Sequence, residues 1–259
     1  MSIKTATLNG VATIEIARPE KKNAITMAMY VAMAEALAAA DADPAVRAVL
    51  ITGQPGIFTS GNDLEDFMQR PPGSGSGSDN VESPPFRFMK ALAGCGKPVV
   101  AAVTGAAIGI GTTLLLHCDL VYVSDEARLA MPFVSLGLVP EFGSSLLAPL
   151  VMGHVRAAEK ILLGEPFTGA EAVELGIANA VLPAAEVAPH ARRMAERFNA
   201  LPPGAVRDTK KLLCRAREQA VLETIGVEGK LFGERLRSPE AKEAFRAFFQ
   251  KRKPDFSGF

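Results

Sequence analysis

Cysteine is scarce in this sequence, and neither sign of charge predominates. The three cysteines, Cys95, Cys118 and Cys214, are scattered and form no CxxC pair. This pattern argues against a disulfide framework and favours reduced, buried thiols in the cytosol. Twenty-eight basic residues balance twenty-eight acidic ones, so the overall charge gives no sign of a nucleic acid or an acidic surface as partner. Any anionic ligand must therefore be bound by local positive groups.

The sequence also lacks a long hydrophobic run. Its longest apolar stretches, around residues 98–103 and 114–123, are interrupted by polar residues or glycine and are too short to span a bilayer. The first ten residues, MSIKTATLNG, contain no apolar segment of the kind that a signal peptide needs. We therefore expect a cytoplasmic protein with no membrane partner and no nucleic-acid partner.

Several familiar site motifs are missing. In the segment GAAIGIG (105–111), a dinucleotide-binding loop would need a third glycine at position 114, which is Leu114, and no lysine follows as in a Walker loop. No GxSxG elbow occurs, and the three histidines are far apart in the sequence. These absences weigh against a nucleotide-binding oxidoreductase and an α/β-hydrolase, and we expect no metal site.

The elements that are present indicate an α/β protein. A chain of 259 residues, 48% hydrophobic and 22% charged, is long enough for one large domain or two small ones. The dipeptide Asn9-Gly10 between two apolar runs predicts a β-hairpin. Strands that alternate with helices favour a mainly parallel sheet with crossover helices. The expected strands are residues 3–8, 11–16, 46–52, 98–103 and 120–124, and the expected helices are 28–40 and 109–118.

The second half of the chain is expected to be mostly helical. Only residues 178–182 are predicted as a strand there. The predicted helices are residues 153–163, 169–176, 184–199, 203–225 and 239–250. In the first half, the low-complexity segment between Arg70 and Pro85 cannot bury apolar surface. We predict a mobile loop, which is either a plain surface insertion or a lid over the neighbouring site.

Two glycine-rich loops carry the strongest functional signal. FTSGNDL (58–64) and GAAIGIG (105–111) each follow a predicted strand and lead into a predicted helix. A helix start presents unpaired N–H groups, and glycine lets the backbone approach a ligand closely. Two convergent N–H groups suit a thioester carbonyl that becomes an enolate, because they stabilise the developing negative charge. For each loop taken alone, a tight packing turn is the alternative.

The two loops together resemble the crotonase (enoyl-CoA hydratase/isomerase) family. RPEKKNAIT (18–26), the long segment 117–145 and FTGAEAVELGIANAVLP (167–183) agree with this resemblance. It implies an α/β fold built as a spiral of ββα repeats, with the core in residues 1–200 and a helical trimerisation region in 201–259. It also implies an acyl-CoA thioester as substrate, no further cofactor, and a homotrimer or hexamer.

The resemblance places the two oxyanion donors on the backbone N–H groups of Asn62 and Ile110. Typical hydratases of the family carry two glutamates, and the matching positions here are Thr113 and Phe133. Neither side chain exchanges a proton usefully. The usual apparatus for adding water across a double bond is therefore missing.

Glu141 is the remaining candidate base. It lies in LVPEFGSS (138–145), an apolar setting that should raise the pKa of its carboxyl toward a useful value. The alternative from the residues alone is that Glu141 caps the following helix. The segment resembles the peroxisomal-type Δ3,Δ2-enoyl-CoA isomerases, which use one glutamate at this place. On that resemblance, Glu141 removes a C2 proton from a 3-enoyl-CoA and returns it at C4.

The expected substrate-binding residues surround these groups, and for some of them a structural role is also open. Asp63 follows Asn62 at a helix start, where it is more often an N-cap. Phe245, Phe248 and Phe249 could close an acyl pocket, although their spacing favours core or trimer packing. Hydration or another crotonase reaction, and an acyl-CoA-binding relative without catalysis, remain alternatives. The expected substrate-binding residues are Lys22, Ser60, Gly61, Asp63, Leu64, Gly109 and Phe133.

Overall fold

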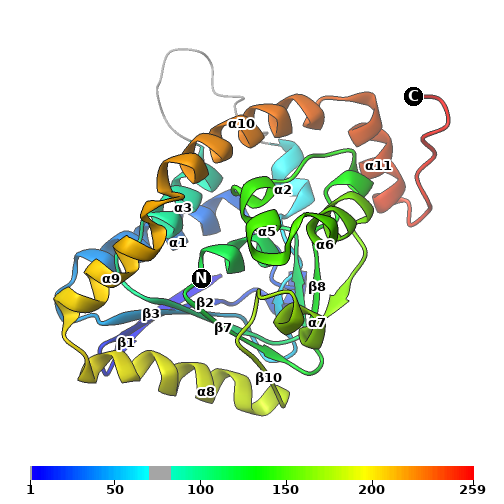
Figure 1. Cartoon of the computed structure of the whole chain (residues 1–259). Coiled ribbons are helices and arrows are strands. Elements are labelled where there is room, and N and C mark those ends of the chain that lie inside the picture. The colour runs from blue at the N-terminus through cyan, green and yellow to red at the C-terminus, as the bar shows by residue number, and fades with distance from the viewer. Residues whose placement is uncertain (1, 70–82) are drawn as a thin grey trace.

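The computed structural model describes residues 2–69 and 83–259, and in them the strands form two sheets (Figure 1). The six-stranded sheet has the order β1-β2-β3-β5-β7-β10 and the four-stranded sheet has the order β4-β6-β8-β9. All pairs are parallel except β1 with β2 and β8 with β9. The strands are β1 (Ile3–Leu8), β2 (Val11–Ile16), β3 (Ala48–Thr52), β4 (Ile57–Thr59), β5 (Val99–Val103), β6 (Ala106–Ile108), β7 (Leu120–Ser124), β8 (Arg128–Ala130), β9 (Phe167–Thr168) and β10 (Ala180–Leu182).

The predicted hairpin is confirmed. Strands β1 and β2 pair antiparallel, and Asn9 and Gly10 connect them with φ of 49° and 70°. Both residues of this two-residue turn lie in the left-handed region, which asparagine and glycine adopt most readily. The mainly parallel character of the remaining sheet is confirmed as well.

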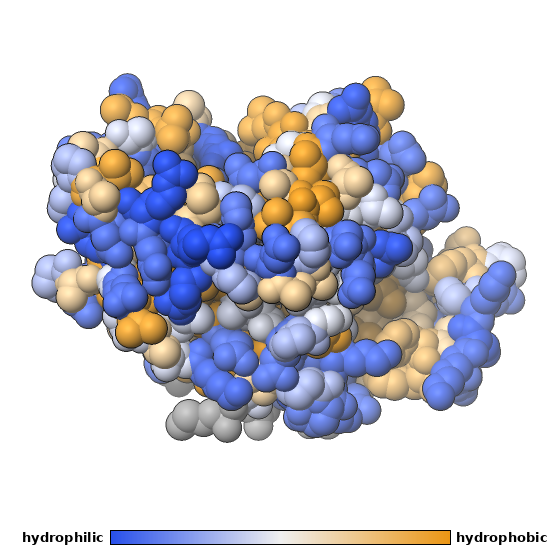
Figure 2. All heavy atoms as spheres, turned by 90° about the horizontal axis from the view of Figure 1, so that it is seen from below, coloured by the Kyte–Doolittle hydropathy of each residue, from blue (hydrophilic) through white to orange (hydrophobic). Residues whose placement is uncertain are grey.

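Helices cover both faces of the six-stranded sheet, and alternate strand residues face opposite sides. One face packs on α8 (Ala184–Glu196) through Val187, Ala191 and Ala195, and the other face packs on α1 (Met27–Ala42) and α3 (Pro84–Ala93). In Figure 1, α8 lies below the sheet, and the view from below in Figure 2 is largely hydrophilic there. A sheet buried on both faces needs continuous apolar strands, which explains the runs at 48–51 and 99–103.

The four-stranded sheet was not expected from the sequence. Its strands have two or three residues each, too short for an alternation of polar and apolar residues to be recognised. Each of β3, β5 and β7 in the large sheet is followed directly by β4, β6 or β8 in the small one, and then by helical turns. This order is the expected spiral of ββα repeats.

One predicted helix was wrong. Residues 203–225 form two helices, because the chain turns at Ala216 and Arg217 between α9 and α10, and α10 continues to Leu236. No glycine or proline marks this break in the sequence. The helices are η1 (Pro19–Lys21), α1, α2 (Leu64–Gln69), α3, α4 (Ile110–Thr113), η2 (Leu114–His117), η3 (Val134–Leu136), α5 (Ser144–Met152), α6 (His154–Ala158), η4 (Glu159–Leu163), α7 (Gly169–Glu174), α8, η5 (Arg197–Ala200), α9 (Pro203–Arg215), α10 (Glu218–Leu236) and α11 (Pro239–Phe249).

The C-terminal helices pack on the same hydrophobic core as the spiral. Val221, Ile225 and Phe232 of α10 and Phe245 of α11 belong to the main buried cluster. The boundary near residue 200 therefore divides parts that share a core, and its functional meaning stays a prediction. The predicted mobile loop falls largely on residues 70–82, which lie outside the described residues. No helix in the described part of the chain is long and apolar enough to cross a membrane.

Candidate active site

The two glycine-rich loops lie side by side because they follow neighbouring strands. Strands β4 and β6 pair in parallel, so their carboxyl ends reach the same edge of the small sheet. Gly61, with φ of 92°, is in contact with the second loop: a Cβ at this position would lie 2.8 Å from the carbonyl oxygen of Ile108. Glycine is therefore required at position 61 by conformation and by the close approach of the two loops.

The backbone around Asn62 directs the N–H of Asn62 away from the neighbouring segment of the same chain. The N–H of Ile25 donates to the carbonyl of Gly61 (2.8 Å), and the N–H of Asp63 donates to the carbonyl of Ile25 (2.9 Å). In such a parallel bridge, the N–H of the intervening residue, Asn62, points to the opposite side. Ile110 is the first residue of α4, where a backbone N–H has no partner within the helix.

Asn62 and Ile110 line one cavity of about 710 Å³. Residues of η1 and of the first loop supply charged and polar groups to its wall, and α10 and α11 supply apolar ones. A mixed lining of this kind suits a ligand that has both a charged part and a hydrocarbon part. The lining residues are Glu20, Lys21, Lys22, Ala24, Ser60, Gly61, Asn62, Asp63, Leu64, Glu65, Phe67, Ile108, Gly109, Ile110, Pro132, Phe133, Ser135, Leu136, Leu138, Phe232, Leu236, Phe245, Phe248 and Phe249.

Glu141 lies in a small apolar chamber beside this cavity. The chamber has a volume of about 20 Å³, and Phe67 and Phe232 line both spaces. The side chain of Glu141 is 5% exposed, and its Oε1 has no hydrogen-bond partner among the described residues. Burial, with a contribution from the neighbouring Glu228 carboxyl, raises the pKa of Glu141 to about 8. A carboxyl in such a state is suited to exchange a proton near neutral pH.

The side chain of Asn62 connects Glu141 to Tyr30 of α1. The Tyr30 hydroxyl donates to Oδ1 of Asn62, which leaves the amide nitrogen of Asn62 for another acceptor. The Asn62 side chain interacts with the Glu141 carboxyl and lowers its pKa, against the effect of burial. Burial, and next the charge of Glu141, raise the pKa of Tyr30 well above its ordinary value. Only a backbone role was expected at Asn62, and no sequence motif indicates this side-chain connection.

Asp63 has a structural role, as its position after Asn62 suggested. Its Oδ1 accepts from the N–H groups of Glu65 and Asp66, each at 3.1 Å, and so caps the start of α2. Its Oδ2 pairs with Nη1 of Arg18 at 2.6 Å. Burial raises the pKa of Asp63, but the hydrogen bonds from Arg18 and the two N–H groups outweigh it, and the net pKa is lowered. Asp63 is thus held ionised and paired.

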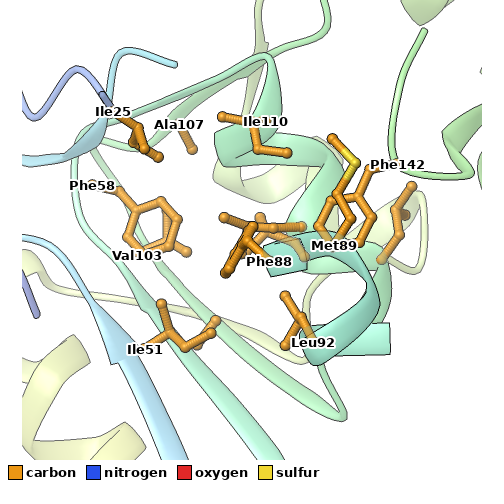
Figure 3. Close-up of a cluster of buried hydrophobic side chains, with 14 of the residues drawn as sticks. Ile25, Ile51, Phe58, Phe88, Met89, Leu92, Val103, Ala107, Ile110 and Phe142 are labelled. Carbon is orange, nitrogen blue, oxygen red and sulfur yellow. The ribbon is translucent and has the colours of Figure 1, made fainter. Parts of the chain in front are cut away.

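The turn that follows Glu141 is unusual. Phe142 and Gly143 both lie in the left-handed region, with φ of 63° and 68°, and the N–H of Ser144 donates back to the carbonyl of Glu141 at 3.2 Å. For phenylalanine this conformation costs about 1–2 kcal/mol. The ring of Phe142 packs against Phe88, as Figure 3 shows, and stacks on His117 with the ring centroids 4.0 Å apart.

The surroundings of the turn compensate for this strain. Nε2 of His117 lies 2.7 Å from the carbonyl oxygen of Phe142. Burial lowers the pKa of His117 to about 4, so the ring is neutral, and we assign its one proton to Nε2 as the donor. The backbone that carries Glu141 is therefore held in place by packing and by hydrogen bonds from outside the turn.

Comparison with known proteins identifies the family. The profile described as "Enoyl-CoA hydratase/isomerase" matches residues 6–258. The chain belongs to the enoyl-CoA hydratase/isomerase family. It is 30% identical over 249 residues to a "Probable enoyl-CoA hydratase" of Bacillus subtilis, covering 96% of this chain and 95% of the relative. It is 36% identical over 224 residues to "Enoyl-CoA delta isomerase 2" of Homo sapiens, covering 85% and 56%.

The fold is shared with solved structures of similar sequence. The structure titled "Structure of Pseudomonas aeruginosa OdaA" is 52% identical in sequence, with a TM-score of 0.90 over 95% of this chain and 98% of the other. Among the sequence relatives, proteins named as hydratases and as isomerases occur at similar identity. Membership of the family therefore leaves the reaction to be argued from the site.

The enoyl-CoA hydratase/isomerase chain described here has no acid at the two positions of the hydratase glutamates. Thr113 is fully buried at the end of α4, and its hydroxyl has no hydrogen-bond partner among residues 2–69 and 83–259. Phe133 lies in the cavity wall. The three acids that do line the cavity each pair with a base: Glu20 and Asp63 with Arg18, and Glu65 with Lys21.

The structure gathers almost all of the predicted site residues around one space. The seven predicted substrate-binding residues line the cavity with Asn62 and Ile110, whereas Glu141 lies in the adjoining chamber. Phe245, Phe248 and Phe249, for which core or trimer packing was favoured, also line the cavity. Within the described residues, no three His, Cys, Asp or Glu side chains form a group that could hold a metal ion.

Proposed function

We propose that the chain is an enoyl-CoA isomerase that moves a double bond from C3 to C2 of an acyl-CoA. The observation that carries this proposal is Glu141, a buried carboxyl with no cationic partner among the described residues and a pKa raised to about 8, adjoining the cavity that Asn62 and Ile110 line. A 1,3-proton transfer needs one group that takes and returns the same proton. It needs neither a bound water nor a second acid.

In the proposed mechanism the thioester carbonyl accepts hydrogen bonds from the N–H groups of Asn62 and Ile110. Ionised Glu141 takes a proton from C2, the C2–H electron pair moves into the thioester, and a dienolate forms. The two N–H groups stabilise the negative charge on its oxygen. Protonated Glu141 then delivers the proton to C4, the double bond settles between C2 and C3, and the carboxylate is regenerated.

Coenzyme A enters this proposal as part of the substrate, with no further cofactor. Lys21 and Lys22 at the end of η1 line the cavity, and we expect them to meet the phosphate groups of coenzyme A. Ser60, Gly61, Leu64 and Gly109 line the same cavity as the two lysines, Asn62 and Ile110. The apolar side chains of α10 and α11 are suited to cover the hydrocarbon part of the ligand.

Hydration is the competing reaction, and the lining of the site disfavours it. Water addition needs a group that activates water and an acid that protonates the neighbouring carbon. Thr113 and Phe133 supply neither, and the acids of the cavity wall are occupied in ion pairs. A relative that binds acyl-CoA without catalysis would not need a buried carboxyl that has one oxygen without a hydrogen-bond partner next to the ligand cavity.

The test is a direct assay on two substrates. We expect the purified protein to convert a 3-enoyl-CoA into the conjugated 2-enoyl-CoA, and Glu141→Gln to lose at least about 10³-fold in kcat while still binding the substrate. Formation of 3-hydroxyacyl-CoA from 2-enoyl-CoA as the faster reaction would favour the hydratase. Saturable binding with no turnover of either substrate would favour the non-catalytic relative.

We also propose self-association into a homotrimer or hexamer. Support comes from large apolar side chains exposed on two helices of the C-terminal region: Leu212 and Leu213 of α9 are 67% and 75% exposed, and Val227 of α10 is 61% exposed. Exposed apolar groups of this kind are typical of surfaces that bury against a partner. Light scattering on the purified chain tests the proposal, and a monomeric mass at micromolar concentration would contradict it.

A further inference from the structure

Two glutamates in the described part of the chain are almost completely buried, and they are neighbours. Glu141 and Glu228 are each 5% exposed, and the charge of Glu228 acts on Glu141. Glu141 follows η3 in the spiral, whereas Glu228 lies in the middle of α10. Burying a carboxyl costs free energy unless its oxygens accept hydrogen bonds. The hydrogen-bond partners of Glu228 therefore indicate its role.

Glu228 uses both of its oxygens to hold the turn that carries Glu141. The N–H of Gly143 donates to Oε2 at 2.6 Å, and the N–H and hydroxyl of Ser145 donate to Oε1 at 2.8 and 2.5 Å. These donors are two and four residues after Glu141. The carboxylate therefore spans the left-handed Phe142–Gly143 pair and the first residues of α5.

The packing of α10 supports the same interpretation. A Cβ on Gly143 would meet side-chain atoms of Val221 and Ile225, so α10 lies directly against the turn. The same helix contributes Phe232, which lines both the large cavity and the Glu141 chamber. Any displacement of α10 would thus move the support of Glu141 and the wall of the substrate cavity together.

We propose that Glu228 is a positioning residue: its carboxylate fixes the strained turn that aims Glu141 at the substrate and places a negative charge beside it. This inference rests on the proposed function for its kinetic consequence, but the coupling between the two carboxyls exists without a substrate. Glu228 does not touch the ligand cavity among the described residues, and it acts through Glu141.

The hydrogen bonds also decide which of the two carboxyls keeps the proton. Burial raises the pKa of Glu228 above its ordinary value, and the three donors oppose this rise because they favour the ionised form. Glu141 has an oxygen without a partner, so it takes up the proton more readily. Among the described residues, Tyr30 of α1 is the other titratable group that faces Glu141, while α2 and α3 contribute Phe67, Phe86 and Met89 to the chamber.

The test compares Glu228→Gln with Glu234→Gln, a change of an exposed glutamate on the same helix. Glutamine keeps the shape of the Glu228 side chain but removes its negative charge. Its amide nitrogen takes the place of one acceptor oxygen, so that a donor faces an N–H donor of the turn. We expect Glu228→Gln to lower kcat on a 3-enoyl-CoA about 10- to 100-fold with little change in KM. The acidic limb of its pH–rate profile should move to lower pH. Glu234→Gln should match the unmodified chain in both respects.

Two further measurements distinguish a failure of this inference from a failure of the proposed function. In the free protein, the ¹³C carboxyl signal of Glu141 should titrate at lower pH in Glu228→Gln and at the unmodified pH in Glu228→Asp, which keeps the charge. Glu228→Asp should also recover part of kcat. An unmodified chain without isomerase activity would refute the proposed function, while a shifted Glu141 signal would still support the coupling. An unshifted signal in a folded Glu228→Gln, or unchanged kcat, would overturn the inference.

Discussion

Replacing Glu141 by glutamine should make the protein more stable at alkaline pH, because burial of an ionisable group is a cost. The pKa of Glu141 is raised from 4.5 to about 8 in the folded state. Below about pH 4.5, folded and unfolded chains both hold the proton and ionisation contributes nothing. Between about pH 4.5 and about pH 8 the unfolded chain releases a proton that the folded chain keeps, so the free energy of unfolding falls as pH rises.

The size of the effect follows from the shift. Each pKa unit corresponds to about 1.4 kcal/mol, and the difference of 8 − 4.5 = 3.5 units gives a loss of up to about 5 kcal/mol above pH 8. At pH 7 the loss is about 3 kcal/mol by the same relation. Glutamine has no proton to release, so the variant avoids this loss. Buried polar substitutions usually destabilise a protein, which makes a pH-dependent gain diagnostic.

Urea unfolding at pH 5, 7 and 9 measures the prediction. We expect the stability of Glu141→Gln relative to the unmodified chain to increase by about 4 kcal/mol between pH 5 and pH 9. Glu126→Gln, a change of an exposed glutamate in the turn after β7, is the matched control and should show no such trend. A difference that stays constant with pH, or a variant less stable at pH 9, would refute the reasoning.

Three further predictions concern the active site. Gly61→Ala should lower kcat/KM about 10²–10³-fold in steady-state kinetics, because a Cβ at 2.8 Å from the Ile108 carbonyl displaces the Asn62 N–H; unchanged kinetics would contradict the assigned donor. Tyr30→Phe should lower the free energy of unfolding in urea by about 1 kcal/mol and lower kcat with KM unchanged, because Oδ1 of Asn62 loses its donor. An unaffected kcat would show that Tyr30 has no role in the site. For the unmodified chain, kcat/KM should rise with pH and level off above about 8, because the free enzyme must carry ionised Glu141; a profile flat from pH 6 to 9 would exclude this base.

The large sheet could be predicted from the sequence because local signals and burial agree there. Asn9-Gly10 specifies a turn, and the continuous apolar runs at 48–51 and 99–103 belong to strands that are covered on both faces. The small sheet could not be predicted, since strands of two or three residues carry no periodicity. The break at Ala216 and Arg217 has no residue that disfavours a helix, so the sequence carries no local signal for it.

For the site, the sequence indicated which residues gather but not how they are held. Asn62, Ile110 and Glu141 were expected on the basis of their motifs. The Tyr30–Asn62 hydrogen bond joins residues 32 positions apart, and Glu228 reaches the Glu141 turn from 83 and 85 residues away. Neither partner forms part of a recognisable motif. The positive φ of Phe142 was also unexpected, because phenylalanine rarely adopts it.

The central claim is that one buried carboxyl moves one proton from C2 to C4. A 3-enoyl-CoA with deuterium at C2, turned over once in ordinary water, tests it most directly. The chamber around Glu141 has room for about one water molecule, so exchange with solvent should be incomplete. We predict that NMR or mass spectrometry of the 2-enoyl-CoA product finds part of the deuterium at C4. The account would be contradicted if Glu141→Gln formed the product at an undiminished rate and that product carried no deuterium at C4.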